Sequence, residues 1–574
     1  MVMRTAAARA ARPRPPGASR LGAAGPALPD PGRAAPGRPE TVVAVAAAVG
    51  AALVGAALAE RVWMGLALLV FVLYVALTTV NLRLAIALWT PTLFLEAVPA
   101  FNLAAKAAGL VIILRWLTAP RGPTPTQWTA GSPAGQPAEP ERPVGRGAWW
   151  GAWWTTGRAG VDFSALRQRP GLVTVGMLLL TWLSLSLLWA VDIGAAATDL
   201  WHWWALVMIF VVVSTAMADM RAVRMAAGAF LAGAVLSVAV GLAGAGPWPS
   251  NPAGLAGAPR LQGGAGDPNF LASWLVAGLI LAVGLIAASE SRALRRLLLA
   301  ASGLAAVGLA ATLSRGAFVA AGASAFAALV LLRRHRRRVA GLILLVTAAA
   351  TAWLATSPAA WERITTNDRG DGRVDLWKVA WSVVRDHPVL GVGLNNYTAV
   401  ESDYVRRVGP VPWLDIIISR AHEVHNAYLQ LLAENGIVGV VLFLAFLILC
   451  LRSMFLATRR FDALGDRRNA TVASAVLLAT FSMAVSGVFL SNAIDKRLWF
   501  LLALGPALLR AATDSPRPPV EHASPPGVFL SPAACAVEER HPAGKEDRRP
   551  ADKPGVRDGI SRPDPGRGSW HGRR

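Results

Sequence analysis

The residue types best able to do chemistry are concentrated in one segment, Gly370 to Gly439, of a chain otherwise rich in Ala, Leu and Val. The segment contains GDGRVDLWKVAWSVVRDHPVLGVGLNNY and, further on, AHEVHNAYLQLLAENGIVG. A guanidinium group binds an oxyanion through two parallel hydrogen bonds, and a histidine accepts a proton near neutral pH. A polar insertion between apolar helices has no evident packing role, so this segment is the first candidate for a functional site.

The composition of the whole chain indicates what surrounds this segment. Hydrophobic residues make up 54% of the chain, and the mean hydropathy is +0.46. About 12–14 apolar runs are long enough to cross a bilayer as α-helices. We therefore expect an all-α fold, a polytopic transmembrane helix bundle with one large, partly helical outward-facing loop. The expected spans are 42–58, 62–80, 83–98, 103–119, 172–189, 203–217, 222–242, 270–288, 297–313, 316–332, 339–355, 437–452, 470–490 and 497–511.

Lysine and arginine residues predict the orientation of the chain. They gather in every second loop, notably at Arg83, Arg221 and Arg224, in the run RRHRRR at 333–338, and between 452 and 468. Since cytoplasmic loops carry the excess of positive charge, this set and both termini are expected inside. The chain is thus expected in the inner (cytoplasmic) membrane, with the 356–436 loop facing outward.

The domain organisation follows from shifts in composition. Residues 1–40 and 512–574 read as disordered cytoplasmic tails, and 120–170 as a cytoplasmic linker rich in Pro, Gly and Trp. Transmembrane helices are expected over 41–119, 171–355 and 437–511, and the 356–436 loop carries the candidate site. The tryptophans at 149–154 are expected to anchor the chain at the membrane interface.

The remaining bulk properties exclude several classes of protein. The formal net charge of +22 is accounted for by the inward-facing loops and the basic tails, so no nucleic-acid partner is expected. Cys450 and Cys535 both lie on the predicted inner side, and they imply no disulfide framework. No cleavable signal peptide is expected, because the first forty residues are too long and irregular for its charged region.

The outward-facing loop contains a predicted amphipathic helix, GRVDLWKVAWSVVRD. Val374, Trp377, Trp381 and Val384 recur at helical spacing, which predicts a helix lying on the membrane. Arg373 stands at its start, where free backbone N–H groups also favour an anion. Arg373 could therefore bind an anionic substrate or simply reach lipid headgroups, and the residues alone do not decide between these roles.

The pair His422 and His425 is expected on one helix that ends at Asn435–Gly436. Its spacing of three differs from the spacing of four in the zinc-protease motif, so that motif is absent. A two-histidine metal site and a histidine packed against the bundle both stay open. The nearby Gly391–Gly393 sequence predicts a tight turn, and it lacks the third glycine of a dinucleotide-binding loop.

Further candidates stand at the predicted outer ends of the spans. Arg315, within Ser314–Arg315–Gly316, joins two spans, and an arginine between helix ends points either to function or to a turn that reaches headgroups. In GDPNF, Asp267 and Pro268 suit the cap and the first position of a helix, which structure alone explains. Lys106 is a lesser candidate for a functional cation.

Taken together, these motifs resemble the O-antigen ligase and polymerase family of bacterial envelope glycan transferases. The resembling stretches are GDPNF at 266–270, SRGA at 314–317, GRVDLW at 372–377, DHPVLGVGLNNY at 386–397 and HNAYLQLLAENGIVG at 425–439. Their order, spacing and shared outer location carry the resemblance, which covers about the second half of the helical region.

The resemblance implies an activity and a set of roles. Family members transfer a glycan from a polyprenyl-pyrophosphate donor to an acceptor hydroxyl, a glycan or a lipid-linked glycan, at the outer face of the inner membrane. It implies that Arg315 and Arg373 bind the pyrophosphate and that His425 is the base, with neither metal nor nucleotide cofactor. Asn426, Asn269, Arg260 and Lys106 are possible auxiliary residues. Two extra spans and the long inner linker depart from the lipopolysaccharide ligases, which leaves the acceptor open.

Two other classes of function compete with a transferase. A transporter or flippase of lipid-linked sugar would place ionisable residues or broken helices near mid-bilayer, with internal repeats. Here the candidate charges gather at helix ends and no repeat is evident. A non-catalytic scaffold would tolerate loss of His425 and the arginines. Ligase and polymerase share these motifs, so the sequence favours a transferase without separating the two.

Overall fold

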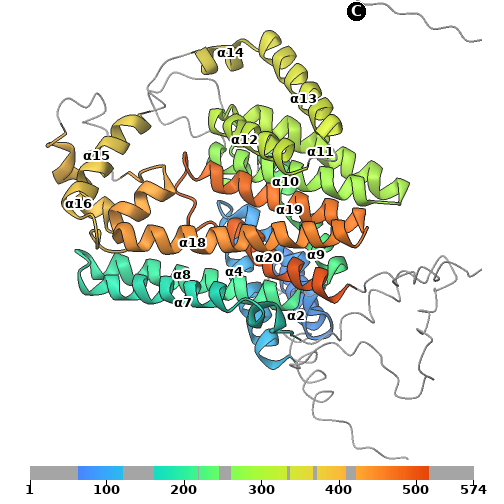
Figure 1. Ribbon diagram of the computed structural model, residues 1–574, viewed down its shortest axis with the longest axis horizontal. Coiled ribbons are helices and arrows are strands. Elements are labelled where there is room, and N and C mark those ends of the chain that lie inside the picture. Colours follow the sequence, from blue (N-terminus) through green and yellow to red (C-terminus); the bar gives the residue numbers. More distant parts are fainter. Residues whose placement is uncertain are drawn as a thin grey trace, which may run out of the picture. The chain divides into compact units, whose positions relative to one another are not determined.

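The computed structural model describes residues 62–119, 161–217, 219–244, 260–332, 336–365, 372–408 and 422–515. Within these ranges the regular structure is helical and contains no β-strand, which confirms the predicted all-α class (Figure 1). The helices before the 245–259 gap are α2 (Val62–Val80), α3 (Leu82–Trp89), η1 (Thr90–Leu95), α4 (Pro99–Thr118), α6 (Ser164–Arg167), α7 (Pro170–Leu185), η3 (Ser186–Leu188), α8 (Ile193–Ala216) and α9 (Met220–Leu242). They are followed by η4 (Gly263–Ala265), α10 (Pro268–Ala288), α11 (Arg292–Thr312), α12 (Arg315–Leu331), α13 (Arg336–Thr356), α14 (Pro358–Thr365), α15 (Arg373–Asp386), α16 (Tyr397–Val405), α18 (Ala427–Ala463), α19 (Arg467–Ser486) and α20 (Lys496–Asp514).

Nine helices in the described ranges are long and apolar enough to cross a membrane, so the predicted polytopic class is confirmed. Shorter apolar segments accompany them in α2, across α3 and η1, and in α12. The predicted span at 42–58 lies outside the described residues, and every other predicted span falls on a helix. The span expected over 83–98 is interrupted, because Pro91 stands at the start of the 3-10 turn that ends α3.

Helix α20 is surrounded by protein rather than exposed on the bundle surface. Every residue from Arg497 to Ala512 is buried, and the helix packs on α18, α8 and α19. A charge in such surroundings is stable only if it is paired. Arg497 pairs with Glu96 at 2.8 Å and Asp495 at 2.9 Å, and Arg510 pairs with Asp162 at 2.6 Å.

Three of the predicted inner loops meet at one end of the bundle, here called the basic end. Arg83, at the start of α3, pairs with Asp219 before α9 and donates to the carbonyl of Ala216. Arg224 of α9 donates to Asn469 of α19. The loops before α3, α9 and α19 are therefore neighbours at this end of the bundle.

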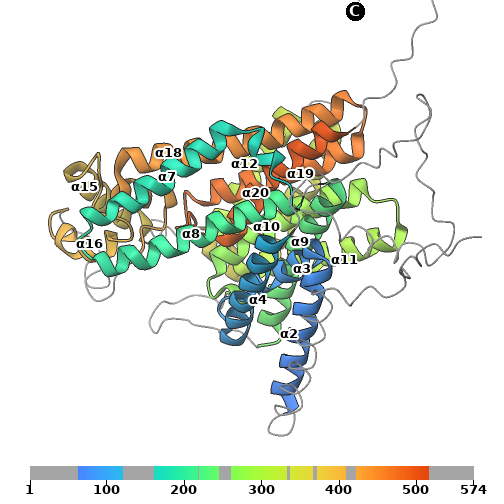
Figure 2. The same ribbon diagram turned by 90° about the horizontal axis from the view of Figure 1, so that it is seen from below.

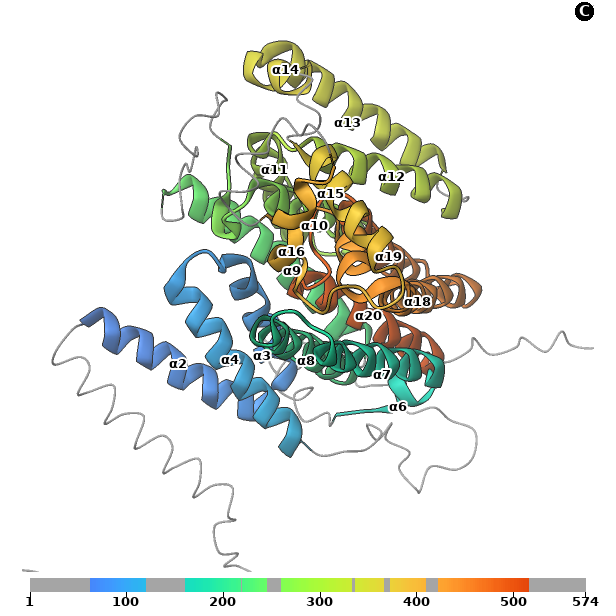
Figure 3. The same cartoon turned by 90° about the vertical axis from the view of Figure 1, so that its left-hand side faces the viewer.

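The opposite end, here called the site end, carries a small helical unit formed by residues 372–408. Its helices α15 and α16 lie at the ends of α7, α8 and α18 (Figures 1 and 2). The end-on view in Figure 3 has this unit in front of the bundle. The two helices share an apolar core of their own, to which Val379 and Val383 of α15 and Tyr397 and Val405 of α16 contribute.

The amphipathic helix predicted over 373–386 forms, and its apolar side chains lie on two sides. Val374 and Trp381 are 42% and 48% exposed, while Leu376, Val379 and Val383 are buried. The buried residues face α16 and α18, with which α15 packs. The tryptophan and valine are left on the outer surface of the unit.

A glycine-rich turn fixes the α15–α16 unit to the bundle. Gly391 and Gly393 have φ of 70° and 101°, as the predicted tight turn requires. A side chain at Gly391 would meet the backbone of Glu434, and one at Gly393 would meet Ala190. The N–H groups of Val392 and Gly393 donate to the carbonyls of Ala433 and Glu434 at 3.0 and 2.8 Å.

Helix α18 is broken at Gly436, which has φ 63° and ψ −170°. The predicted helix end at Asn435–Gly436 is therefore present, although a second helical stretch continues from Ile437. The N–H of Ile437 donates to the carbonyl of Pro388 at 2.9 Å. The kink thus lies where the chain between α15 and α16 packs against α18.

Candidate functional site

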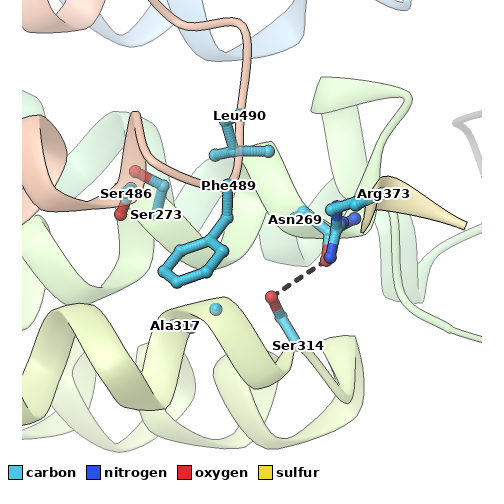
Figure 4. A pocket seen from close by; sticks show the side chains of 9 residues that line it. Asn269, Ser273, Ser314, Ala317, Arg373, Ser486, Phe489 and Leu490 are labelled. Carbon is cyan, nitrogen blue, oxygen red and sulfur yellow. Dashed lines mark hydrogen bonds between the residues drawn. The ribbon is translucent and has the colours of Figure 1, made fainter. Parts of the chain in front are cut away.

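A small recess lies at the site end, where the first turns of three helices meet (Figure 4). Asn269 belongs to the first turn of α10, Gly316 to that of α12, and Arg373 begins α15. The starts of α12 and α15 have no side-chain cap, so their N–H groups and positive dipole ends favour an anion here. The lining consists of Asn269, Ser273, Ser314, Gly316, Ala317, Arg373, Ser486, Phe489 and Leu490.

Asn269 is held in place by its neighbours on both sides. Asp267 caps α10 by accepting from the N–H groups of Asn269 and Phe270 at 2.7 and 2.9 Å, as its position before Pro268 predicts. The Oδ1 atom of Asn269 accepts from Ser314 at 2.9 Å and from Arg260 at 2.8 Å. With its oxygen occupied twice, Asn269 has a fixed orientation in the recess.

The turn between α11 and α12 places the residues on both sides of Arg315 in the lining of the recess, but not Arg315 itself. Leu313 adopts φ 50°, and the chain then reverses into α12 at Arg315. Ser314 gives its hydroxyl hydrogen to Asn269 instead of capping α12 with its oxygen. Arg315 is half-buried and stands between two lining residues, Ser314 and Gly316.

Arg373 reaches the recess from the separate α15–α16 unit. Gly372 precedes it with φ 79°, a conformation that favours glycine and turns the chain into α15. Figure 4 shows the Arg373 side chain beside Asn269. The structure therefore brings together Arg373, Asn269, Arg260 and the start of α12, although Arg260 and Arg373 are 113 positions apart in the sequence.

The prediction that His422 and His425 share one helix is wrong. Residues 422–426 are not helical, and α18 begins only at Ala427. His425 has φ 53°, which is uncommon for a residue with a side chain. The helix starts late because Asn426 caps it, accepting from the N–H groups of Tyr428 and Leu429 at 3.1 and 3.0 Å.

The non-helical histidine segment, residues 422–426, ends next to the recess. The N–H of Ala427 lies 2.8 Å from the carbonyl of Gly487 and 2.9 Å from that of Leu490. Leu490 lines the recess, so His425 is two residues from a direct contact with its wall. The oxygen of Asn426 is used as the helix cap, which limits the predicted role of this residue in orienting substrate.

Two predicted auxiliary residues differ in their surroundings. Arg260 joins the recess through Asn269 and also donates to the carbonyl of Thr312 at 2.8 Å, so it ties α10 to the end of α11. Lys106, exposed on α4, instead belongs to the surroundings of Glu96. Burial would raise the pKa of Glu96, but Arg497, Lys496 and Lys106 together hold that pKa below its ordinary value.

Sequence reasoning missed Glu401, which contacts the histidine segment directly. Glu401 is 1% exposed, and its Oε1 accepts from the backbone N–H of His422 at 2.7 Å. Burial raises the pKa of Glu401 to about 7, and the hydrogen bond from His422 partly opposes this. The signal was present, because Tyr397, Glu401 and Val405 recur every fourth residue and therefore share one helix face.

The alternative role of His422 and His425 is to bind a metal ion. Within the described ranges, no group of three or more His, Cys, Asp or Glu side chains is arranged to hold a metal ion. The two histidines of the 422–426 segment would need further ligands to form such a site.

The fold and the recess define a class: a polytopic α-helical membrane protein with an anion-suited site at the ends of its helices. Residues 300–444 match the family model described as O-antigen ligase. The predicted resemblance to the O-antigen ligase family is thereby confirmed over this stretch, and it supports a ligase- or polymerase-type function in surface glycan biosynthesis. No curated protein shows significant similarity to the chain.

Proposed function

We propose that this protein is a membrane glycan transferase of O-antigen ligase type. It moves a glycan from a polyprenyl-pyrophosphate donor to an acceptor hydroxyl at the outer face of the inner membrane. The observation that carries the proposal is the recess, in which Arg373 meets the first turns of α10 and α12. A pyrophosphate is the part of such a donor that the N-termini of α12 and α15 and a guanidinium would bind.

In this mechanism Arg373 and Arg315 hold the pyrophosphate, and His425 takes the proton of the acceptor hydroxyl. The hydroxyl oxygen attacks the anomeric carbon as the bond from that carbon to the pyrophosphate oxygen breaks. A new glycosidic bond forms, polyprenyl pyrophosphate leaves, and the arginines stabilise its added negative charge. With base and leaving group on opposite sides of the carbon, the product has inverted configuration.

The same site would serve a polymerase that extends surface polysaccharide repeat units, and the length of the product separates the two activities. A ligase attaches the whole donor glycan once, whereas a polymerase gives a ladder of lengths. The transporter alternative predicts translocated donor with no new glycosidic bond.

The proposed sidedness rests on the separation of the basic end from the site end. Arginine-rich loops are retained in the cytoplasm, so the recess would face outward. A cysteine placed at Thr365, the last residue of α14, is expected to react with an impermeant thiol reagent in intact cells. A cysteine at Ala340, near the start of α13, is expected to be protected. The opposite labelling pattern would reject an outward site.

The central test replaces Arg373 and measures glycan transfer by purified protein in liposomes. Lysine keeps the charge but loses the bidentate geometry, so Arg373→Lys is expected to reduce transfer about 10- to 100-fold. Arg385→Lys is the matched control, because Arg385 is exposed on the same helix. Full transfer by Arg373→Ala would remove this residue from the site.

A further inference from the structure

The histidine segment, residues 422–426, is fixed at three points, although none of it is helical. At its beginning, the N–H of His422 donates to Glu401 at 2.7 Å. In its middle, Val424 is fully buried and packs in the core of the α15–α16 unit. At its end, Asn426 caps α18, and the next N–H, of Ala427, contacts Gly487 and Leu490.

These three attachments come from different parts of the molecule. Asn426 and Ala427 connect the segment to the bundle, whereas Glu401 and Val424 connect it to the α15–α16 unit. Between them His425 holds φ at 53°, which costs a residue with a side chain some free energy. A strained conformation of this kind persists only where the surroundings determine it, so both ends must be held.

Glu401 differs from the other residues that hold the segment because it carries a carboxyl group within an apolar core. It is 1% exposed, and its helix is itself fixed to α15, since Tyr404 donates to Asp386 at 2.9 Å. A buried carboxyl group opposes folding unless its hydrogen bonds offset the lost hydration. Glu401 makes such a bond to the backbone of the histidine segment, which an apolar residue at this position could not make.

We infer that Glu401 is a positioning residue that sets the conformation of residues 422–426 and thereby the place of His425. The inference rests on the proposed function for the role of His425, and on the contacts above for the position of the backbone. Glu401 acts through the His422 N–H and takes no part in the reaction itself. The property that matters is therefore an acceptor oxygen at this place, not a negative charge.

Three variants separate the role of an acceptor oxygen at this position from that of a negative charge. Glu401→Gln keeps an acceptor oxygen and removes the charge. Glu401→Met keeps the approximate size and removes the acceptor. Asp403→Asn, on the exposed side of the same helix, is the matched control for the loss of a carboxylate from α16.

The first readout is hydrogen–deuterium exchange of peptides that cover residues 422–426 in the full-length protein. Glu401→Met is expected to increase exchange there, while Glu401→Gln and Asp403→Asn resemble the wild type. The second readout is transfer. Glu401→Met is expected to lower kcat about 100-fold, with KM for the donor nearly unchanged, because a base displaced by about 1 Å loses alignment rather than donor affinity.

Opposite results would overturn the inference in distinct ways. Wild-type exchange and kcat in Glu401→Met would show that this hydrogen bond does not position the segment. Equal losses in Glu401→Gln and Glu401→Met would assign the effect to charge and reject the acceptor role. If the wild type itself transfers no glycan, the proposed function fails, yet the exchange comparison still decides whether Glu401 fixes the segment.

Discussion

Two arginines at the site end both lie in the first turn of a helix, but their surroundings differ. Arg497, in the first turn of α20, is 3% exposed. It pairs with the carboxylates of Glu96 and Asp495 and lies 3.8 Å from the centre of the Trp274 ring. Arg373, at the start of α15, is half-buried, and none of the described residues that line its recess carries a carboxylate.

The difference bears on which of the two arginines is the better candidate for binding a ligand. A buried arginine whose charge is met by two carboxylates holds helices together, and an incoming anion would have to displace them. The described lining of the recess, by contrast, offers amide, hydroxyl and apolar groups beside Arg373. The Arg497 cluster is therefore structural in this comparison, and the recess stays the proposed place for the substrate.

The largest expected effect concerns the base that the recess would need. If the recess is the site, His425→Ala is expected to reduce transfer by about 10²–10⁴-fold, because the acceptor hydroxyl loses its general base. Binding of polyprenyl pyrophosphate should persist, since the arginines are intact. Both quantities can be measured on purified protein in liposomes.

His422→Ala is the matched control for this prediction. The contact of His422 with Glu401 uses the backbone N–H, which alanine retains. Its effect on transfer is therefore expected to be much smaller. Near wild-type product formation by donor-loaded His425→Ala would reject the mechanism, and inhibition by chelators would favour the metal alternative.

The second-largest expected effect tests whether Arg497 and its carboxylate partners stabilise the fold. Arg497→Met leaves Glu96 and Asp495 without their buried partner, and breaking such a pair costs about 3–5 kcal/mol of stability. Thermal unfolding in detergent should show a clear decrease. Lys496→Met is the control, because Lys496 pairs with the same Glu96 from a more exposed position. A stable Arg497→Met protein that had lost donor binding would reverse the assignment of the two regions.

The sequence predicted the helices better than the geometry of the site. Apolar runs located the spans because burial in lipid requires continuous apolar helices, and the Asp267–Pro268 cap was local enough to predict. The histidine segment was missed because its conformation depends on Glu401 and Leu490, which are distant in sequence. The recess likewise unites Asn269, Ser314 and Arg373 through tertiary packing, which periodicity within one element does not reveal.

The smallest expected effect compares two carboxyl groups that their surroundings shift in opposite directions. Burial raises the pKa of Glu401 from 4.5 to about 7, whereas Glu96, despite its burial, has a lowered pKa because of Arg497, Lys496 and Lys106.

Between pH 4.5 and 7 the folded protein binds more protons at Glu401 than the unfolded chain does, so this group's contribution to stability decreases as the pH rises through that window. Glu401→Gln removes the titration, and the stability of this variant relative to the wild type should therefore increase from pH 4.5 to 7 and then level off.

At Glu96 the sign is opposite. A carboxyl group whose pKa is lowered by folding stabilises the fold at pH values above its pKa in the unfolded chain, and this stability is lost as the pH falls. Glu96→Gln should accordingly be most destabilising near neutral pH and least in acid. Thermal unfolding of both variants across this pH range is the measurement. If the stability of the two variants relative to the wild type changed with pH in the same direction, the contrast between Glu96 beside its cations and Glu401 in its apolar core would be contradicted.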